Sequence, residues 1–234
     1  MSGKVFVTGD SHGTFSRFSF KSWPEGKTLD KDDYLIIAGD FGGVWDDSPG
    51  EKKRLAWLNE KPWTTLFIDG NHENFDMLNK LPIADMFGAG VGVVASSIFH
   101  LKRGFIYTVA GNRILTIGGG LSIDKKYRIE GKSWWAAEEL NNEETERCWG
   151  ALANRKGFEY VISHVPPQRF VENISSFPGK IFDVTAIKLE DIYCAMDGNF
   201  KKWYHGHMHA DFQHDQKMVG LYKEIVQLGN DLIQ

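Results

Sequence analysis

The stretch Thr64-Thr65-Leu66-Phe67-Ile68 is a short run of apolar and β-branched residues, which is typical of a buried strand. Gly70-Asn71-His72-Glu73 follows it almost at once, and residues 74–78 have the pattern of a helix start. An amide, an imidazole and a carboxylate therefore lie at the carboxyl end of a strand, the edge of an open α/β sheet where ligands usually bind. We expect Asn71 to hold a metal ion and His72 to act beside it.

The same order of strand, glycine and polar residue occurs twice earlier in the chain. Val5–Thr8 leads into Gly9-Asp10-Ser11-His12, and Tyr34–Ala38 leads into Gly39-Asp40. The spacing of about thirty residues is that of a βαβ unit, and residues 51–59 suit a crossover helix. Such a sheet brings the three polar positions to one edge. Taken alone, each could instead be a turn, with Asp10 capping the segment that follows.

Two further strand ends supply histidines. Tyr160–Ser163 is an apolar run that ends at His164, where Val165-Pro166-Pro167 prevents a strand or helix from continuing. His207 and His209 are two positions apart, so in extended backbone they face the same side. A single histidine at a strand end is more often a structural residue. His164 therefore gains significance only from the histidine pair.

The composition is that of a globular protein. With 234 residues, 42% hydrophobic and 25% charged, the chain is expected to form one domain over residues 1–234. The net charge of −4 argues against a general nucleic-acid coat or a polybasic membrane patch, and no window approaches the roughly 18 apolar residues of a membrane span. Cys148 and Cys194 are too few for a disulfide framework. Together with an amino terminus unlike a signal peptide, these features predict a cytoplasmic location and no membrane partner.

Local patterns predict the remaining elements. Strands are expected at residues 98–101, 105–109 and 113–117, helices at residues 133–140, 143–154 and 184–196, and a loop at residues 168–183. Ser133 is the expected cap of its helix. We interpret His100 as a structural or exposed histidine, because no polar residues are grouped around it in the sequence.

Taken in order, these motifs resemble the signature of the calcineurin-like metallophosphoesterases. They are Asp10-x-His12, Gly39-Asp40, Gly70-Asn71-His72-Glu73, His164 and Gly206-His207-x-His209. The Gly-Gly-x-x-Ser-x-Asp-Lys stretch that begins at Gly118 resembles a bacterial and phage subgroup. The resemblance implies an α/β fold, a four-layer α-β-β-α sandwich with two mixed β-sheets.

The resemblance also implies two divalent metal ions. One would be held by Asp10, His12 and His209, the other by Asn71, His164 and His207, and Asp40 would bridge both. Oxygen and imidazole donors without thiolate suit Mn²⁺ first, with Fe, Zn²⁺ or Ni²⁺ as alternatives. Two dications, the two carboxylates and one bridging hydroxide leave a single net positive charge, which attracts a phosphate. A carboxylate in place of the neutral Asn71 would cancel that charge.

The implied activity is hydrolysis of a phosphomonoester or a phosphodiester. The bridging hydroxide would attack phosphorus in line, and His72, which is no ligand in the family pattern, would protonate the leaving alkoxide as general acid. His72 and Asp40 are thus the implied catalytic residues, with Glu73 or Asp40 orienting the imidazole. The partner is a phosphate ester, for which a nucleotide is one candidate. The sequence indicates no obligate nucleic-acid partner.

The motifs themselves do not assign the residues that bind the phosphate. Protein Ser/Thr phosphatases of this superfamily carry an arginine shortly after the second-motif aspartate, and Asp40 has none. We expect the segment after Gly118-Gly119-Gly120 to supply Lys125 or Arg128 instead. The alternative for this segment is a solvated loop. The alternative for the chain is a non-catalytic interaction scaffold with the same fold, although such proteins usually show replaced ligands.

Overall fold

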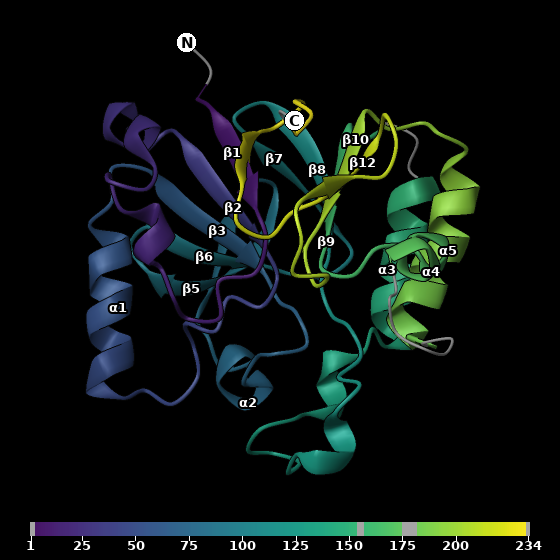
Figure 1. Ribbon diagram of the computed structural model, residues 1–234, viewed down its shortest axis with the longest axis horizontal. Helices are drawn as coiled ribbons and strands as arrows, with labels where there is room; N and C mark the ends of the chain where they lie inside the picture. Colours follow the sequence, from purple (N-terminus) through teal and green to yellow (C-terminus); the bar gives the residue numbers. More distant parts are fainter. Residues whose placement is uncertain (1–2, 154–156, 175–181, 233–234) are drawn as a thin grey trace.

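Figure 1 shows the computed structural model, which describes residues 3–153, 157–174 and 182–232. Two β-sheets face each other, and helices cover their outer faces (Figure 1). Both sheets contain parallel and antiparallel pairs. The predicted four-layer α-β-β-α sandwich with two mixed sheets is confirmed.

Sheet A contains seven strands within the described residues, in the order β13-β1-β2-β3-β6-β5-β4. Strands β1, β2, β3 and β6 are parallel, while β13, β5 and β4 pair antiparallel to their neighbours. Their bounds are β1 Val5–Thr8, β2 Tyr34–Ala38, β3 Thr64–Ile68, β4 Ile83–Met86, β5 Ala89–Ala95, β6 Ile98–Leu101 and β13 Ile225–Gln227. The strands predicted at residues 5–8, 34–38, 64–68 and 98–101 therefore have the expected bounds.

Sheet B contains six strands within the described residues, in the order β11-β12-β10-β9-β8-β7. Strands β8, β9, β10 and β12 are parallel. The bounds are β7 Phe105–Val109, β8 Asn112–Ile117, β9 Tyr160–Ser163, β10 Lys202–His205, β11 Phe212–Gln213 and β12 Met218–Gly220. The parallel strands of each sheet end at the same edge of the sandwich.

Helices cover the outer face of each sheet. Helix α1, Pro49–Asn59, lies on sheet A, and α3, α4 and α5 lie on sheet B (Figure 1). The bounds of the latter are α3 Asn142–Ala153, α4 Gln168–Ile174 and α5 Val184–Met196, and a short α2 spans Phe75–Leu78. Four 3₁₀ turns span Ser16–Phe18, Pro24–Thr28, Lys125–Tyr127 and Ala136–Glu138. None of the described helices is long and apolar enough to cross a membrane.

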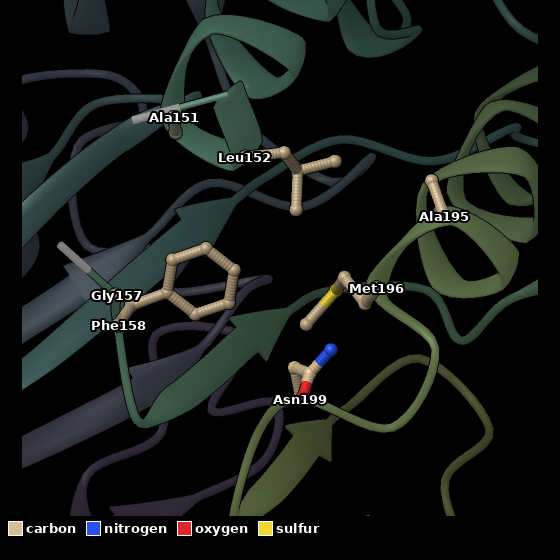
Figure 2. A pocket seen from close by; sticks show the side chains of 7 residues that line it. All are labelled: Ala151, Leu152, Gly157, Phe158, Ala195, Met196 and Asn199. Carbon is tan, nitrogen blue, oxygen red and sulfur yellow. The ribbon is translucent and has the colours of Figure 1, made fainter. Parts of the chain in front are cut away.

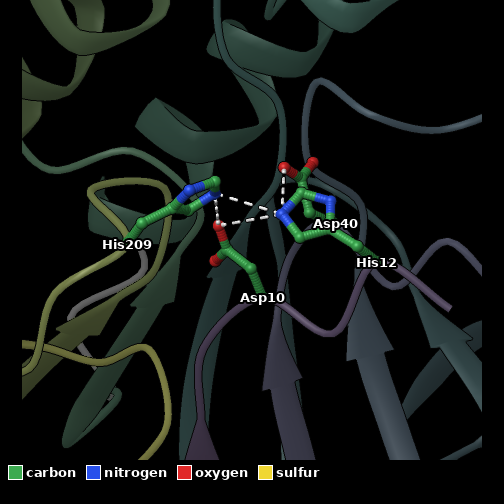
Figure 3. Close-up of side chains that lie close together, drawn as sticks. All are labelled: Asp10, His12, Asp40 and His209. Carbon is green, nitrogen blue, oxygen red and sulfur yellow. Dashed lines mark hydrogen bonds and ion pairs between the residues drawn. The ribbon is translucent and has the colours of Figure 1, made fainter. Parts of the chain in front are cut away.

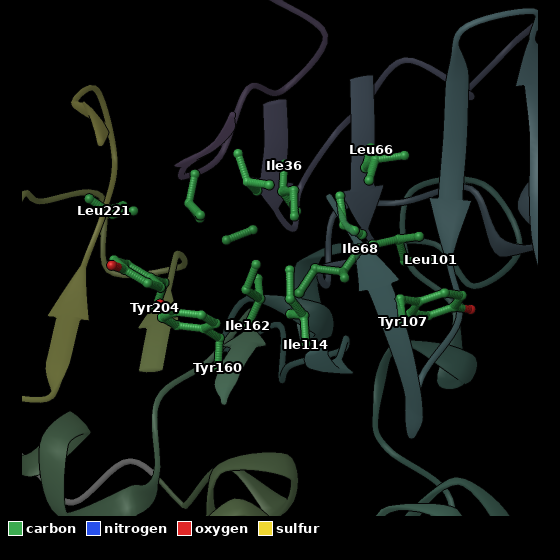
Figure 4. Packing of buried hydrophobic residues seen from close by; sticks show 14 of the residues in the cluster. Ile36, Leu66, Ile68, Leu101, Tyr107, Ile114, Tyr160, Ile162, Tyr204 and Leu221 are labelled. Atoms are coloured by element: carbon green, nitrogen blue, oxygen red, sulfur yellow. The ribbon is translucent and has the colours of Figure 1, made fainter. Parts of the chain in front are cut away.

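The core is divided by the sheets into three layers. The largest layer fills the space between the two sheets and includes Ile36, Ile68, Ile114, Ile162 and Tyr204 (Figure 4). The alternate residues of the same strands pack outward, on α1 for sheet A and on α3 and α5 for sheet B. Because both faces of the central strands are buried, these strands read as continuous apolar runs. Burial on both faces fixes each strand in the sandwich, and so it fixes the position of the residue at which the strand ends.

Two local predictions are wrong. Residues 133–140 form an irregular segment in which the extended residues Trp135 and Glu139 flank a single 3₁₀ turn, Ala136–Glu138, and the Arg103 guanidinium donates to the carbonyls of residues 137–139. Ser133 Oγ accepts a hydrogen bond from the Ile129 N–H and caps no helix. Residues 168–174 of the predicted loop form α4, and residues 175–181 lie outside the described residues.

Candidate metal centre and active site

The predicted ligands converge where the parallel strands of the two sheets end. Asp10, Asp40 and Asn71 follow β1, β2 and β3 of sheet A, while His164 and the His207/His209 pair follow β9 and β10 of sheet B. The glycine before a ligand makes this approach possible. A Cβ on Gly70 would lie 2.1 Å from Asp40 Oδ1, and a Cβ on Gly206 would lie 2.2 Å from Asp10 Oδ1.

The first cluster contains Asp10, His12, Asp40 and His209, whose candidate ligand atoms all lie within 4.8 Å of one another (Figure 3). His209 Nε2 is 3.1 Å from both His12 Nε2 and Asp10 Oδ2. His12 Nε2 is 3.8 Å from Asp40 Oδ2. Asp40 Oδ2 is buried and has no hydrogen-bond partner among the described residues. A buried carboxylate oxygen without a partner is costly, and a cation at this position would satisfy it.

The second cluster contains Asn71, His164 and His207. Asn71 Oδ1 is 3.0 Å from His164 Nε2 and 3.1 Å from His207 Nδ1. The other oxygen of Asp40, Oδ1, is 3.4 Å from His164 Nε2. Asp40 therefore lies between the two clusters and presents one oxygen to each.

The tautomer of His164 shows why the second cluster fits a cation. Its Nδ1 is 3.0 Å from the Ala38 carbonyl oxygen, which can only accept a hydrogen bond. In the neutral ring Nε2 then carries the lone pair, and it faces the acceptor oxygens of Asn71 and Asp40. Lone pairs that converge in this way are stabilised by a positive charge at their centre. Both clusters thus have the donor types and the arrangement of a divalent metal site.

Asn71 is held in place by Ser122, the serine of the Gly-Gly-x-x-Ser-x-Asp-Lys stretch, and through it by Glu138, which belongs to none of the motifs. Its Nδ2 donates to Ser122 Oγ at 3.1 Å, and that hydroxyl donates to Glu138 Oε2 at 2.7 Å. The Ser122 N–H donates to the other Glu138 oxygen at 2.8 Å. All three residues are buried. Because the amide nitrogen is engaged by Ser122, the amide oxygen points into the cluster.

Backbone strain is concentrated at the same residues. His12, Asp40, His207 and His209 have φ values of 45°, 45°, 66° and 49°, in the left-handed region that non-glycine residues rarely adopt. Each such residue costs about 1–3 kcal/mol and persists only where surrounding contacts hold it. Strain of this kind clusters at functional sites.

The pKa shifts of the ligands differ in direction. At His164 burial is outweighed by the charges of Asp40 and Asp10, which raise the pKa, and the hydrogen bond with Asp10 raises the pKa of His209, so a cation would displace a proton from each of these rings. The shifts of Asp10 and His207 favour metal binding. Burial alone would raise the pKa of Asp10, but the hydrogen bond with His209 and the nearby His164 outweigh it and hold the pKa below its usual value. Burial, together with His164, lowers the pKa of His207 to about 3. A carboxylate and a neutral imidazole are the forms that bind metal.

A family model described as calcineurin-like phosphoesterase matches residues 3–211. The chain belongs to the calcineurin-like phosphoesterase family. Members of this family use divalent metal ions, in agreement with the Asp/His cluster. The resemblance read from the five motifs is confirmed.

Two curated relatives of the phosphoesterase are lariat debranching enzymes. That of Schizosaccharomyces pombe is 36% identical over 117 residues, 43% of this chain and 24% of the relative. That of Danio rerio is 32% identical over 136 residues, 51% of this chain and 22% of the relative. The chain spans about a quarter of the length of these relatives. The structure of phosphopantetheinyl hydrolase (PptH) from Mycobacterium tuberculosis superimposes with a TM-score of 0.51 and 11% identity, covering 95% of this chain and 90% of that one, and this likeness shows the fold alone.

His72 lies beside the clusters without joining either. Its ring is 5.5 Å from that of His12, between centroids, and its backbone N–H donates to Asp40 Oδ1 at 2.7 Å. Arg128 Nη1 lies 2.9 Å from His72 Nδ1. Burial lowers the pKa of His72; Asp40 opposes this change and the Arg128 charge adds to it.

Glu73 does not orient His72. Its carboxylate accepts hydrogen bonds from the backbone N–H groups of Phe41 and Gly42, at 2.6 and 3.2 Å. Burial, and then the Asp40 charge, raise the pKa of Glu73 well above its usual value. The expectation that Glu73 is the partner of His72 is therefore wrong. Glu73 fixes the loop that follows β2.

The two predicted phosphate-binding cations differ in their placement. Arg128 contacts His72 and is anchored by Asp124 Oδ1, 2.7 Å from its Nε. Lys125 is directed to Glu139, with Nζ 3.0 Å from Oε1, and does not contact the clusters. The segment projects from the end of the sandwich near α2 (Figure 1).

A cleft of about 450 Å³ opens over the second cluster. Its polar side contains Asp40, Asn71, His72, His207 and His209. Its apolar wall is formed by Leu121, Ile123, Val171 and Met208. A separate hollow of about 430 Å³ lies between α3 and α5, lined by Phe158 and Met196 among others, and contains none of the predicted site residues (Figure 2).

His100 belongs to a polar network that the sequence pattern did not reveal. Its Nε2 is 3.0 Å from Asp69 Oδ1, while Arg103 Nε donates to Asp69 Oδ2 at 2.7 Å and Arg103 Nη1 donates to Glu144 at 2.9 Å. His100 is therefore structural, as one of the two interpretations held, but it is not isolated. The network anchors the residue that precedes Gly70. The only sign of this network in the sequence is the Asp69-Gly70 pair after β3, which places its central carboxylate.

Proposed function

We propose that the chain is a binuclear-metal-dependent phosphoesterase. In this proposal one ion is held by Asp10, His12 and His209, the other by Asn71, His164 and His207, and Asp40 bridges them. The observation that carries the proposal is the position of Asp40, whose two carboxylate oxygens face the two different clusters. Asp10 comes near this arrangement, with Oδ1 3.9 Å from His164 Nδ1 and Oδ2 3.1 Å from His209 Nε2, but that Nδ1 faces the Ala38 carbonyl. Asp40 is the described carboxylate that faces an Nε2 atom of each cluster with a different oxygen.

The donor set supports hard or borderline dications. Carboxylate, amide and imidazole atoms suit Mn²⁺ first, with Fe, Zn²⁺ and Ni²⁺ as alternatives. When bound, such ions supply Lewis acidity for a phosphoryl group and lower the pKa of bound water. The chain itself supplies a dry, strained cradle that keeps the ligands in one arrangement.

In our proposal His72 is the general acid. Its side chain is beside the clusters, and its two ring nitrogens face Arg128, at 2.9 and 3.4 Å, rather than a ligand oxygen, so the ring can reach a leaving group once Arg128 pairs with a phosphate. The Arg128 charge holds down the proton affinity of the ring in the absence of substrate. A phosphate that paired with Arg128 would neutralise this charge, and His72 would then keep its proton until the ester bond breaks.

Arg128 is the cation that we propose for phosphate binding. A guanidinium matches the geometry of phosphate oxygens, and this one lies at the mouth of the site. The proposed role of Lys125 is weaker support from outside the cleft, because its ammonium is paired with Glu139. A cytoplasmic location stays a prediction.

The substrate class is a phosphate ester, mono- or diester. The curated relatives are named for lariat debranching, but they match only part of this chain, so we transfer no more than phosphoester hydrolysis. The apolar wall of the cleft favours an ester with an apolar or aromatic group on one side of the phosphate.

The test combines metal analysis with hydrolysis of p-nitrophenyl phosphate and its bis-ester. Purified protein loaded with Mn²⁺ should hold two ions per chain and hydrolyse at least one of the two esters. The Asp40→Asn variant should lose both bound metal and activity, because it removes the bridging carboxylate. Absence of metal and of activity with several divalent ions would favour the scaffold alternative.

A further inference from the structure

A second cleft, of about 720 Å³, lies on the other side of the metal clusters. The loop after β1 and the exposed side of α1 form its walls, and His12, Thr14, Ser16, Lys53, Arg54 and Trp57 are among the residues that line it. The cleft over the second metal cluster, here called the first cleft, is lined by His209 and not by His12. Because His12 Nε2 and His209 Nε2 are only 3.1 Å apart, the two clefts meet at the first metal cluster.

The charge of the second cleft is positive. Lys53 and Arg54 are exposed and line the cleft, and the Arg54 charge also acts on the nearby Asp46 carboxylate. The neighbouring Lys52, by contrast, is paired with Asp47 at 2.7 Å and does not line the cleft. No carboxylate is among the lining residues. In a chain with a net charge of −4, two exposed cations beside a candidate phosphate site, with no carboxylate lining the cleft, favour a second anionic group.

The wall also offers a flat aromatic surface. Trp57 is half-buried and lines the cleft, with Lys61 Nζ 3.4 Å from the ring centroid. Indole rings stack with nucleobases of any sequence, and cations next to them hold the backbone phosphates of single strands. The exposed hydroxyls of Thr14 and Ser16 add hydrogen-bond donors. An aromatic ring and a second phosphate on one ligand describe a nucleotide.

We propose that the second cleft binds the part of the substrate beyond the scissile phosphate, and that this part is a nucleotide unit with its own phosphate. The preferred substrate is then a short single-stranded oligonucleotide, whose scissile phosphodiester lies at the metal clusters between the two clefts. This inference rests on the proposed phosphoesterase function. A phosphomonoester would fill one cleft only. A long duplex is disfavoured by the net negative charge.

Binding without chemistry tests the cleft directly. A fluorescently labelled, 5′-phosphorylated tetranucleotide is titrated with the metal-free protein in EDTA, and anisotropy is followed at several salt concentrations. Lys53→Ala/Arg54→Ala should weaken binding about tenfold and reduce the salt dependence by about 0.7 per lost phosphate contact. Trp57→Ala should weaken binding by a similar factor through lost stacking. Lys52→Ala, which removes one positive charge from the same helix outside the cleft, should leave binding unchanged, and Lys53→Ala alone is the single-charge variant to compare with it.

Turnover separates this inference from the proposed function. With Mn²⁺, the ratio of kcat/KM for the tetranucleotide to that for bis-p-nitrophenyl phosphate should fall about tenfold in the Lys53→Ala/Arg54→Ala variant. If no ester is hydrolysed but the cleft variants still weaken binding, the phosphoesterase proposal is wrong, while the proposal that the second cleft binds a nucleotide is supported. If the bis-ester is hydrolysed but binding is unaffected by the cleft variants, or Lys52→Ala weakens it equally, the cleft proposal is wrong.

Discussion

Ser122 has no side-chain contact with a metal ligand except Asn71, yet Ser122→Ala is expected to change metal binding. The substitution removes the oxygen that accepts from Asn71 Nδ2 at 3.1 Å and donates to Glu138 at 2.7 Å. The amide then has no partner that distinguishes its nitrogen from its oxygen. When it turns, an N–H group replaces the oxygen that faces His164 and His207.

The magnitude follows from the lost contacts. A buried donor left without a partner costs about 1–3 kcal/mol of stability. Glu138 still accepts the hydrogen bond from the Ser122 N–H at 2.8 Å, so its buried carboxylate keeps a hydrogen-bond partner in the variant. Loss of a residue that orients a metal ligand typically costs about 10–100-fold in metal affinity. We expect this loss at the second ion only, because Asn71 does not contact the cluster of Asp10, His12 and His209.

The assay is calorimetric titration of chelator-stripped protein with Mn²⁺. Wild type should show two binding events, and Ser122→Ala should retain one affinity and lose at least tenfold in the other. Thr116→Val is the matched control, because it removes a buried hydroxyl that donates to the Lys102 carbonyl at 2.7 Å, away from the clusters. If both ions bind Ser122→Ala as they bind wild type, or if Thr116→Val shows the same loss, Ser122 does not position Asn71.

Three further predictions concern the acid, the phosphate and the fold. His72→Asn should keep its metal content and lose about 10²–10⁴-fold in kcat, more for alkyl than for nitrophenyl esters; equal losses for both esters would rule out an acid. Arg128→Ala should raise KM for phosphate esters about tenfold, and unchanged KM and kcat would contradict phosphate binding. Burial lowers the pKa of His214 to about 4, so between about pH 6.5 and 4 the unfolded chain binds a proton that the folded chain does not. The free energy of unfolding should therefore decrease as the pH is lowered from about 6.5 to 4. In urea unfolding, the dependence of this free energy on pH should be weaker for His214→Gln than for wild type, and an identical dependence would refute the linkage.

The parallel strands could be predicted from the sequence because their environment is uniform. Residues 34–38 and 64–68 are buried on both faces, so apolar character alone marks their bounds. Residues 133–140 gave the wrong prediction because distant partners hold this segment in an irregular conformation: Glu138 accepts from Ser122, and the carbonyls of residues 137–139 accept from Arg103. Local propensity carries no information about such a partner. The α4 segment was missed because Pro178-Gly179 suggested a loop over the whole of residues 168–183.

The ligands of the candidate site could be predicted because they follow strands that are themselves visible in the sequence. Polar residues directly after apolar runs are visible in the sequence, and the topology brings Asp10, Asp40 and Asn71 together. The support of Asn71 by Ser122 and Glu138 could not be found in this way, since Ser122 contacts Asn71 from a segment 51 residues later and Glu138 acts only through Ser122, both in an irregular part of the chain. His205 and His214 pair through their Nε2 atoms at 3.0 Å. A histidine count alone cannot separate this structural pair from the ligands.

The structure explains why Gly70–Glu73 dominates the sequence pattern. Gly70 allows Asp40 to approach, the Asn71 oxygen faces His164 and His207, the His72 N–H binds Asp40, and Glu73 binds the backbone of Phe41 and Gly42. Three of these four residues thus fix the loop after β2 in the left-handed conformation that Asp40 requires. The stretch therefore holds the bridging carboxylate in place as well as supplying a ligand. Loss of Glu73 should weaken both metal sites together, whereas loss of Ser122 should weaken one.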